Sequence, residues 1–247
     1  MKKILLKLIN SLLRPVPARM KDSLVRTLIR SRVQSQTPDK ALRFLFELDD
    51  VLYELQGIKA IEYGHGVHAK HRLIRYEDFF VARIRKNERV LDIGCGNGFL
   101  AHAVVSRTGA SVLGIDLSTA KIEQASATYR LDNLEFRQGD AFSDLPDSPF
   151  DVVILSNVLE HLQGRPEFLR QIMDTIAPGR ILLRVPVFER DWRVPLKKEL
   201  GVEWRLDPTH EIEYTLEEFQ QEIHAAGLAE ASLEIRWGEI WAEAVRP

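Results

Sequence analysis

The stretch Arg89-Val-Leu-Asp-Ile-Gly-Cys-Gly-Asn-Gly-Phe-Leu100 decides the fold of this chain. The run that ends at Ile93 has the apolar pattern of a short strand buried on both faces, as in a parallel sheet. Gly94, Gly96 and Gly98 follow at alternate positions, and they let backbone N–H groups approach a ligand without interference from Cβ atoms. The stretch therefore predicts a strand, a ligand-binding loop and the start of a helix, although a tight turn without a ligand is the alternative.

Acidic residues recur along the predicted strands. Asp92 belongs to the first strand and offers a carboxylate to a cationic or hydroxylated ligand. Residues 111–116 have the pattern of a second buried strand that ends in Asp116, and Ser118 suits the N-cap of the next helix. Asp116 lies about twenty residues beyond the glycine loop, where nucleotide-binding folds place the acid that accepts ribose hydroxyls. A simple turn acid is the alternative at this position.

Three more strands and a hairpin complete the pattern. The strands are predicted at 134–138, 150–156 and 180–186. Near the end of the chain, residues 233–237 and 239–245 alternate in polarity on both sides of Gly238, which indicates an antiparallel hairpin. These elements predict an α/β domain with a mainly parallel sheet.

The motif Asp92-Ile-Gly94-Cys-Gly96, followed by Asp116 and then Asp140, resembles class I S-adenosylmethionine-dependent methyltransferases. The resemblance implies a Rossmann-like fold with a mostly parallel seven-stranded sheet and a C-terminal antiparallel hairpin, preceded here by an N-terminal helical extension. It implies S-adenosylmethionine as cofactor, with the amino-acid half beside the glycine loop, the ribose on Asp116 and the adenine beside Asp140. The cofactor-binding residues that it implies are Asp92, Gly94, Cys95, Gly96, Asp116, Leu117, Asp140, Ala141, Asn157 and Arg72.

The composition fits one folded α/β domain with an extension. The chain has 247 residues, and 45% of them are hydrophobic, which is enough for a sizeable core. Its single cysteine, Cys95, cannot form an internal disulfide, so nothing indicates an oxidising compartment. No motif around Cys95 suggests thiolate chemistry, and we expect this residue to be a small filler of the loop.

The first forty residues carry an excess of positive charge. They hold ten Lys or Arg against two Asp, a net charge of +8, whereas the whole chain carries −2. Apolar residues recur at helical spacing in 4–13 and in 24–29, which predicts two short basic amphipathic helices. Such helices bind anionic membranes, pack on the domain or form an oligomer interface. Packing on the domain or in an oligomer, and peripheral membrane contact through residues 1–33, are both left open, and no nucleic-acid partner is expected.

The expected location is cytoplasmic, with the inner face of the cytoplasmic membrane as the alternative to a free protein. No apolar run is long enough to span a bilayer. Lys7 and Asn10 interrupt the apolar stretch of the N-terminus, and no small-residue cleavage site follows, so a signal peptide is not expected.

Three regions are predicted along the chain. Residues 1–38 form the basic helical extension, 39–84 a helical lid region, and 85–247 the methyltransferase domain. In the lid region, apolar residues from Leu42 to Leu55 recur at spacings of three and four, which predicts a long helix with one apolar face.

Three histidines lie within seven residues of the lid region. His65, His68 and His71 invite a metal hypothesis, because imidazoles are common ligands, but no acidic or cysteine ligand accompanies them. We therefore predict no metal site. Instead we expect His68 and His71 to bind the acceptor and Arg72 to reach the carboxylate of the cofactor, while a solvated loop is the alternative.

Methyl transfer to a hydroxyl needs a base. The displacement takes place at a carbon already activated by a sulfonium, so the protein positions the acceptor, excludes water and removes a proton. We expect His210 to be the general base and His161 the second candidate, with Glu160 or Asp207 orienting the imidazole. Asp207 and Tyr214 are expected to bind the acceptor. Each of these groups also has a structural alternative, as a cap or a loop contact.

A narrower resemblance concerns the acceptor. The segments His68-Ala-Lys-His-Arg72 and Asp207-Pro-Thr-His-Glu-Ile-Glu-Tyr-Thr215 look like methyltransferases encoded among bacterial surface-polysaccharide genes, which modify sugar hydroxyls. This resemblance implies O-methylation of a sugar hydroxyl on a glycan or on a lipid-linked saccharide.

Other functions were compared with this prediction. A quinone-like or other small-molecule hydroxyl is the alternative acceptor, and a non-catalytic binding protein of the same fold is the alternative to an enzyme. Such a protein would be expected to have lost the cofactor acids, yet Asp92, Asp116 and Asp140 are present. The glycine spacing disfavours an oxidoreductase. The segment Ser156-Asn-Val-Leu159 replaces the Asn-Pro-Pro-Tyr tetrad usual in nucleic-acid amine methyltransferases.

Overall fold

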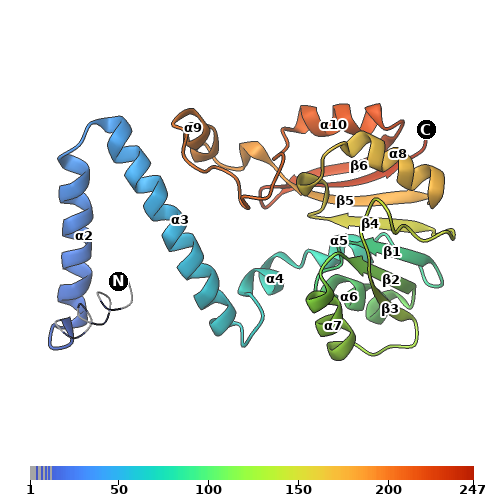
Figure 1. Ribbon diagram of the computed structural model, residues 1–247, viewed down its shortest axis with the longest axis horizontal. Helices are drawn as coiled ribbons and strands as arrows, with labels where there is room; N and C mark the ends of the chain where they lie inside the picture. Colours follow the sequence, from blue (N-terminus) through green and yellow to red (C-terminus); the bar gives the residue numbers. More distant parts are fainter. Residues whose placement is uncertain (1–3, 5–6, 8, 10, 12) are drawn as a thin grey trace. The chain divides into compact units, whose positions relative to one another are not determined.

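The computed structural model describes residues 4, 7, 9, 11 and 13–247 (Figure 1). The chain divides into two compact units, Met1–Lys59 with Glu199–Val202 and Ala60–Lys198 with Glu203–Pro247. The region boundaries expected at residues 38 and 84 stay predictions.

Two helices make up most of the first unit, α2 at Ala18–Gln34 and α3 at Pro38–Tyr63. The basic amphipathic helix predicted at 24–29 lies within α2. No residue of α2 is buried, and the side chains of Leu24 and Leu28 are 45% and 59% exposed. The apolar side of this helix is thus exposed in the part of the chain that the structure describes.

Half of the other predicted basic helix, at 4–13, lies outside the described residues, because 5–6, 8, 10 and 12 are not among them, and the described residues 4, 7, 9, 11 and 13 are helical. Of the helices in the described part of the chain, none combines the length and the hydropathy that crossing a bilayer requires. The contact of residues 1–33 with a membrane surface stays a proposal.

A seven-stranded sheet forms the second unit, in the order β3-β2-β1-β4-β5-β7-β6. Strands β1 to β5 run parallel, whereas β7 is antiparallel to both of its neighbours, β5 and β6. The predicted fold class is therefore confirmed. The strands are β1 (Arg89–Ile93), β2 (Ser111–Asp116), β3 (Leu134–Gln138), β4 (Val152–Ser156), β5 (Arg180–Pro186), β6 (Ala229–Arg236) and β7 (Glu239–Val245).

Helices pack on both faces of this sheet. One hydrophobic core contains side chains of α5 and α6, and a second core contains side chains of α8 and α10. The remaining elements connect the strands or border the site. The helices after α3 are α4 (Ala69–Ile74), α5 (Glu77–Val81), α6 (Phe99–Thr108), α7 (Thr119–Thr128), η1 (Leu159–His161), α8 (Arg165–Thr175), η2 (Phe188–Arg190), α9 (Arg193–Glu199) and α10 (Leu216–Ala225).

The central strand β1 carries buried apolar side chains on both faces because both faces are covered, and Asp92 near its carboxyl end is the buried exception. Val90 belongs to the core that includes α6, while Leu91 and Ile93 belong to the core that includes α8. All three side chains are at most 1% exposed. Polar chemistry is therefore confined to the carboxyl ends of the parallel strands, where the connecting loops begin.

The C-terminal hairpin turns on two residues with positive φ. Trp237 and Gly238 have φ values of 55° and 76° between β6 and β7. Two successive positive φ angles are the signature of a tight hairpin turn whose twist matches that of the strands. The hairpin predicted around Gly238 is thus confirmed.

The loop after β1 requires its glycines. Gly94, Gly96 and Gly98 have φ values of 72°, 57° and 78°. A Cβ atom at Gly94 would lie 2.6 Å from Cγ2 of Val158, and one at Gly98 would overlap the ring of Phe136. At Gly96 nothing lies within 4 Å of a Cβ position, so the backbone there is open to an approaching ligand.

We predict that Gly94→Ala destabilises the protein through steric overlap. Gly227→Ala is the matched control, because Gly227 has a φ of 76° but no atom within 4 Å of a Cβ position. The free energy of unfolding of the control should fall by about 1–2 kcal/mol, the cost of an alanine in the left-handed conformation. The free energy of unfolding of Gly94→Ala should fall by about 1–3 kcal/mol more than that of the control, because its new methyl group overlaps Val158. Chemical denaturation of both variants measures the difference, and equal losses would contradict the prediction.

Candidate functional site

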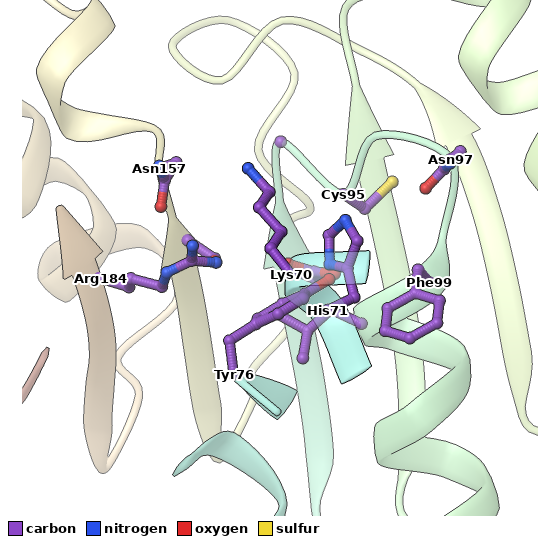
Figure 2. Close-up of a pocket in the computed structure, with 12 residues that line it drawn as sticks. Lys70, His71, Tyr76, Cys95, Asn97, Phe99, Asn157 and Arg184 are labelled. Carbon is purple, nitrogen blue, oxygen red and sulfur yellow. The ribbon is translucent and has the colours of Figure 1, made fainter. Parts of the chain in front are cut away.

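A cavity of about 210 Å³ lies at the carboxyl ends of β1 and β4. Figure 2 shows that side chains from three parts of the second unit converge on it. These are Lys70, His71 and Tyr76 around α4 and α5, then Asp92, Gly94, Cys95, Asn97, Phe99 and Leu100 around the glycine loop, and Ser156, Asn157 and Arg184 at the ends of β4 and β5.

Asp92 is a buried carboxylate at the wall of this cavity. Its side chain is 1% exposed, and its Oδ2 atom has no hydrogen-bond partner in the described part of the chain. Burial raises the pKa of Asp92 to about 8, and the negative charge of Asp116 adds to this rise. An unpaired carboxylate facing a cavity favours a cationic ligand group, which would restore its charged form.

Asp116 fixes the two loops that border the site. Its Oδ2 atom accepts a hydrogen bond from the N–H of Gly96 at 2.9 Å, and its Oδ1 atom accepts one from Ser118 at 2.9 Å. Ser118 caps α7, as predicted, since its side chain accepts from the N–H of Lys121. A carboxylate has about four acceptor positions, so Asp116 keeps capacity for ribose hydroxyls.

Three further cofactor candidates lie at the neighbouring strand ends. The N–H of Gly139 donates to the carbonyl of Asp116 at 3.1 Å, which brings the ends of β2 and β3 together. Asp140 Oδ1 accepts from the N–H groups of Phe142 and Ser143, so this carboxylate also holds its own turn. Leu117 is 67% exposed and offers an apolar surface. None of Asp116, Leu117, Asp140 and Ala141 lines the cavity itself.

Cys95 lines the cavity without the features of a nucleophile. Burial raises the pKa of its thiol, and the charges of Asp92 and Asp116 raise it further. The thiol is therefore protonated at neutral pH and is a weak nucleophile.

The lid residues divide between the cavity and the surface. His68 caps α4, because its Nδ1 atom accepts from the N–H of Lys70 at 3.0 Å. His71 lines the cavity, and burial, with a contribution from Lys70, lowers its pKa to about 4, so the ring is neutral. Arg72 is exposed and does not line the cavity, which differs from the expected contact with the cofactor carboxylate. The cations that line it are Lys70 and Arg184.

Arg184 is a site residue that sequence reasoning missed. Its guanidinium donates to both carboxylate oxygens of Glu239, at 2.8 and 2.6 Å, and lies 4.6 Å from the ring centre of Tyr76. The N–H of Asn157 donates to the carbonyl of Arg184, which links the ends of β4 and β5. A charged residue inside the apolar run of β5 was the signal in the sequence.

A second group of polar side chains combines residues of η1, directly after β4, with His210 from the segment between α9 and α10. One potential ligand atom from each of Glu160, His161 and His210 lies within 4.8 Å of the other two. Glu160 is fully buried, and neither of its carboxylate oxygens has a hydrogen-bond partner among the residues described. Burial is the main cause that raises the pKa of Glu160 to about 8. The rings of His161 and His210 lie 4.6 Å apart, centre to centre.

The acids that hold these imidazoles differ partly from expectation. The sequence suggested Glu160 or Asp207 as the orienting acid. Asp207 acts indirectly, through Thr209, whose hydroxyl lies 2.7 Å from Asp207 and 2.9 Å from Nδ1 of His161. Glu213, which sequence reasoning did not single out, lies 3.0 Å from Nδ1 of His210.

Tyr214 occupies the core, which differs from the expected contact with the acceptor. Its side chain is fully buried, and its hydroxyl donates to Glu222 at 2.7 Å. Tyr214 also extends the structure next to β5, since its N–H donates to the carbonyl of Pro186. The polar character of this segment had suggested a binding surface, but Tyr214 stabilises the fold.

The family model described as a methyltransferase domain matches residues 84–228. The mitochondrial ubiquinone biosynthesis O-methyltransferase of Schizosaccharomyces pombe is 37% identical over 102 residues, which cover 39% of this chain and 37% of the relative. The 2-methyl-6-phytyl-1,4-hydroquinone methyltransferase of Synechocystis is 27% identical over 154 residues, 58% of this chain and 47% of the relative. The chain thus spans about half, or less, of the length of these relatives.

Solved structures support the same fold. The magnesium protoporphyrin IX methyltransferase of Synechocystis, solved with bound SAH, superposes with a TM-score of 0.58. It is 19% identical, and the match covers 76% of this chain and 86% of the other. Identity at this level supports the fold alone.

We predict that Asp92→Asn stabilises the ligand-free protein and more so at high pH. The pKa of Asp92 is raised from 3.8 to about 8 in the folded chain. Between pH 3.8 and about pH 8 the carboxyl of Asp92 is therefore protonated in the folded chain and ionised in the unfolded chain. The free energy of unfolding contributed by Asp92 falls as the pH rises through this range. The variant should raise Tm more at pH 8 than at pH 5, while its affinity for S-adenosylmethionine falls about 10-fold or more.

Thermal unfolding at the two pH values and calorimetric titration measure these effects. Asp132→Asn is the control, since Asp132 is exposed and distant in sequence from the glycine loop. A Tm difference that is the same at both pH values, or an undiminished affinity, would contradict the role assigned to Asp92.

Proposed function

Because the chain belongs to the methyltransferase-domain family, we propose that it is an S-adenosylmethionine-dependent enzyme whose acceptor is a hydroxyl group of a small molecule. The observation that carries this proposal is the Glu160, His161 and His210 cluster that follows β4. Proton-accepting groups beside the methyl donor are needed for a hydroxyl acceptor, whereas a free amine needs none.

The residues of the cavity fit the cofactor. S-adenosylmethionine supplies a methyl group on a positively charged sulfur, which makes that carbon the electrophile. Asp92 has an unpaired carboxylate oxygen for the ammonium group, and the open backbone at Gly96 leaves room for close approach. Lys70 and Arg184 line the cavity and would bind the carboxylate of the cofactor, while Asp116 would accept hydrogen bonds from its ribose hydroxyls.

The cavity and the cluster are connected through the chain. Asn157 lines the cavity, and Glu160 is three residues further on. Asn157 has a φ of 57°, and its side-chain Oδ1 atom is buried without a partner in the described structure. A strained residue with an unsatisfied polar atom is typical of a functional position. We infer that the acceptor lies between Asn157 and His161, and that His161, which is exposed, is the base closest to it, ahead of the buried His210.

A phenolic hydroxyl of a quinol-like molecule is the acceptor class that we favour. The relatives named above include enzymes of ubiquinone and hydroquinone methylation. A phenol loses its proton near pH 10, far more easily than a sugar hydroxyl, so one imidazole is a sufficient base. A sugar hydroxyl is the second candidate, and the observation in its favour is Trp192, which is 72% exposed close to η2 and is suited to stacking on a sugar.

We predict that the protein transfers a radiolabelled methyl group from S-adenosylmethionine to a dihydroxyphenyl compound. His161→Gln should lower kcat by about 10²–10⁴, the usual contribution of a general base. His224→Gln is the control, because His224 is an exposed histidine that pairs with Glu230. If a methyl hexoside is methylated and the dihydroxyphenyl compound is not, the sugar hydroxyl becomes the favoured acceptor. Methyl transfer to neither compound would contradict the proposal of a hydroxyl acceptor.

We further propose that α2 attaches the protein to an anionic membrane. Met20, Leu24 and Leu28 are spaced four residues apart, so they share one side of the helix, and all three are exposed. Arg26 and Arg30 lie on another side. Apolar insertion together with basic charge is the combination that binds anionic lipid surfaces, and a quinol or a lipid-linked saccharide is found at such surfaces.

We predict that the protein floats with vesicles that contain an anionic lipid and not with neutral vesicles. Leu24→Ser with Leu28→Ser should reduce the bound fraction, and added salt should reduce it as well. Val51→Ser in α3 is the control, because Val51 is half exposed on another helix. An equal bound fraction with neutral vesicles, or a bound fraction that the substitutions in α2 leave unchanged, would contradict this attachment.

A further inference from the structure

Glu160, His161 and His210 have the donor set and the spacing of a metal site. The potential ligand atoms of the three side chains lie within 4.8 Å of one another. Two imidazole nitrogens and one carboxylate oxygen are the ligands of open zinc sites and of other first-row transition metals. We propose that these three residues bind a divalent transition-metal ion of the zinc type.

Glu160 indicates that the cluster is incomplete without a cation. Its side chain is fully buried, and both carboxylate oxygens lack a hydrogen-bond partner among the described residues. The positive charge of Arg184 acts on it, but that guanidinium is held by both oxygens of Glu239. A buried carboxylate is retained in proteins where it is paired or coordinates a metal, and none of the described side chains makes a hydrogen bond to this one.

The hydrogen bonds around His161 select the tautomer that a metal requires. The hydroxyl of Thr209 donates its only proton to Oδ1 of Asp207 at 2.7 Å. The contact of 2.9 Å between Thr209 and Nδ1 of His161 must therefore be donated by the imidazole. This leaves the lone pair of Nε2 free for a metal.

His210 is held in the same way. Its Nδ1 atom lies 3.0 Å from a carboxylate oxygen of Glu213, so it donates its proton there. Glu213 is fixed in turn by an ion pair with Arg190 and by the N–H of Leu206. A carboxylate behind a histidine is the usual outer shell of a metal ligand, because it fixes the ring and raises its basicity.

The bound ion would have positions left for the acceptor. Three protein ligands leave at least one open position on a tetrahedral or larger coordination sphere. An acceptor hydroxyl bound there would lose its proton at a lower pH, because the cation would stabilise the oxyanion. With the metal bound, His161 would be a ligand and the ion would activate the hydroxyl, so the imidazole of His161 would act as the base only in the metal-free protein. This role of the ion rests on the proposed transfer to a hydroxyl, whereas metal binding by the three residues stands on their geometry alone.

Cobalt titration of the full-length protein tests the site. After treatment with a chelator, the protein should bind one Co²⁺ per chain with visible absorption bands, and Zn²⁺ should displace it. Glu160→Gln and His161→Ala should each weaken binding by at least about 10-fold. His224→Ala, at an exposed histidine paired with Glu230, should bind as the unchanged protein does. The proposal would be overturned if no Co²⁺ binds, or if the Co²⁺ affinity is unchanged in both Glu160→Gln and His161→Ala.

Two further measurements separate this inference from the proposed function. Calorimetric titration with S-adenosylmethionine shows whether each variant is folded, since the cavity residues are unchanged in all of them. If Co²⁺ binds as expected but no hydroxyl compound is methylated, the metal site stands and the proposed acceptor fails. If a phenol is methylated equally well by the chelator-treated protein, and no Co²⁺ binds, the acceptor stands and the metal site fails.

Discussion

The carboxylate of Asp116 is the interaction on which the site depends. It holds the glycine loop through the N–H of Gly96 and the start of α7 through the N–H of Ser118, each at 2.9 Å. The glycine loop follows β1 and the other loop follows β2, so the side chain of Asp116 sets the distance between them. The same charge raises the pKa of Asp92, which contributes to the need for a cationic ligand. A single acid thus shapes the backbone of the site and its electrostatics.

Two buried acids, Asp92 and Glu160, lower the stability of the fold at positions assigned to ligand binding. Each lacks a partner for at least one carboxylate oxygen in the described structure, and burial raises the pKa of both to about 8. Perturbed acids of this kind collect at functional sites, where a ligand later supplies the missing charge. Asp92 serves the cavity and Glu160 the histidine cluster, so the two acids mark neighbouring parts of one site.

The sequence predicted those features that depend on local pattern. The apolar run of β1, the glycines with positive φ, the cap at Ser118 and the turn at Gly238 each follow from a few adjacent residues. Side-chain pairs distant in the chain were beyond such reasoning. Arg184 pairs with Glu239, 55 residues away, and Tyr214 was expected to bind the acceptor although its hydroxyl donates to Glu222 in the core. Only the folded chain reveals which polar side chains are already satisfied.

The strand order has a consequence for protein synthesis. β7 follows β6 in the sequence, yet it lies between β5 and β6 in the sheet. Arg184 on β5 therefore meets its carboxylate partner, Glu239, only after residues 239–245 have been made. Until then the guanidinium at the cavity wall is unpaired and the edge of β5 is open. A chain on the ribosome acquires a complete cofactor pocket only when its final strand has been inserted.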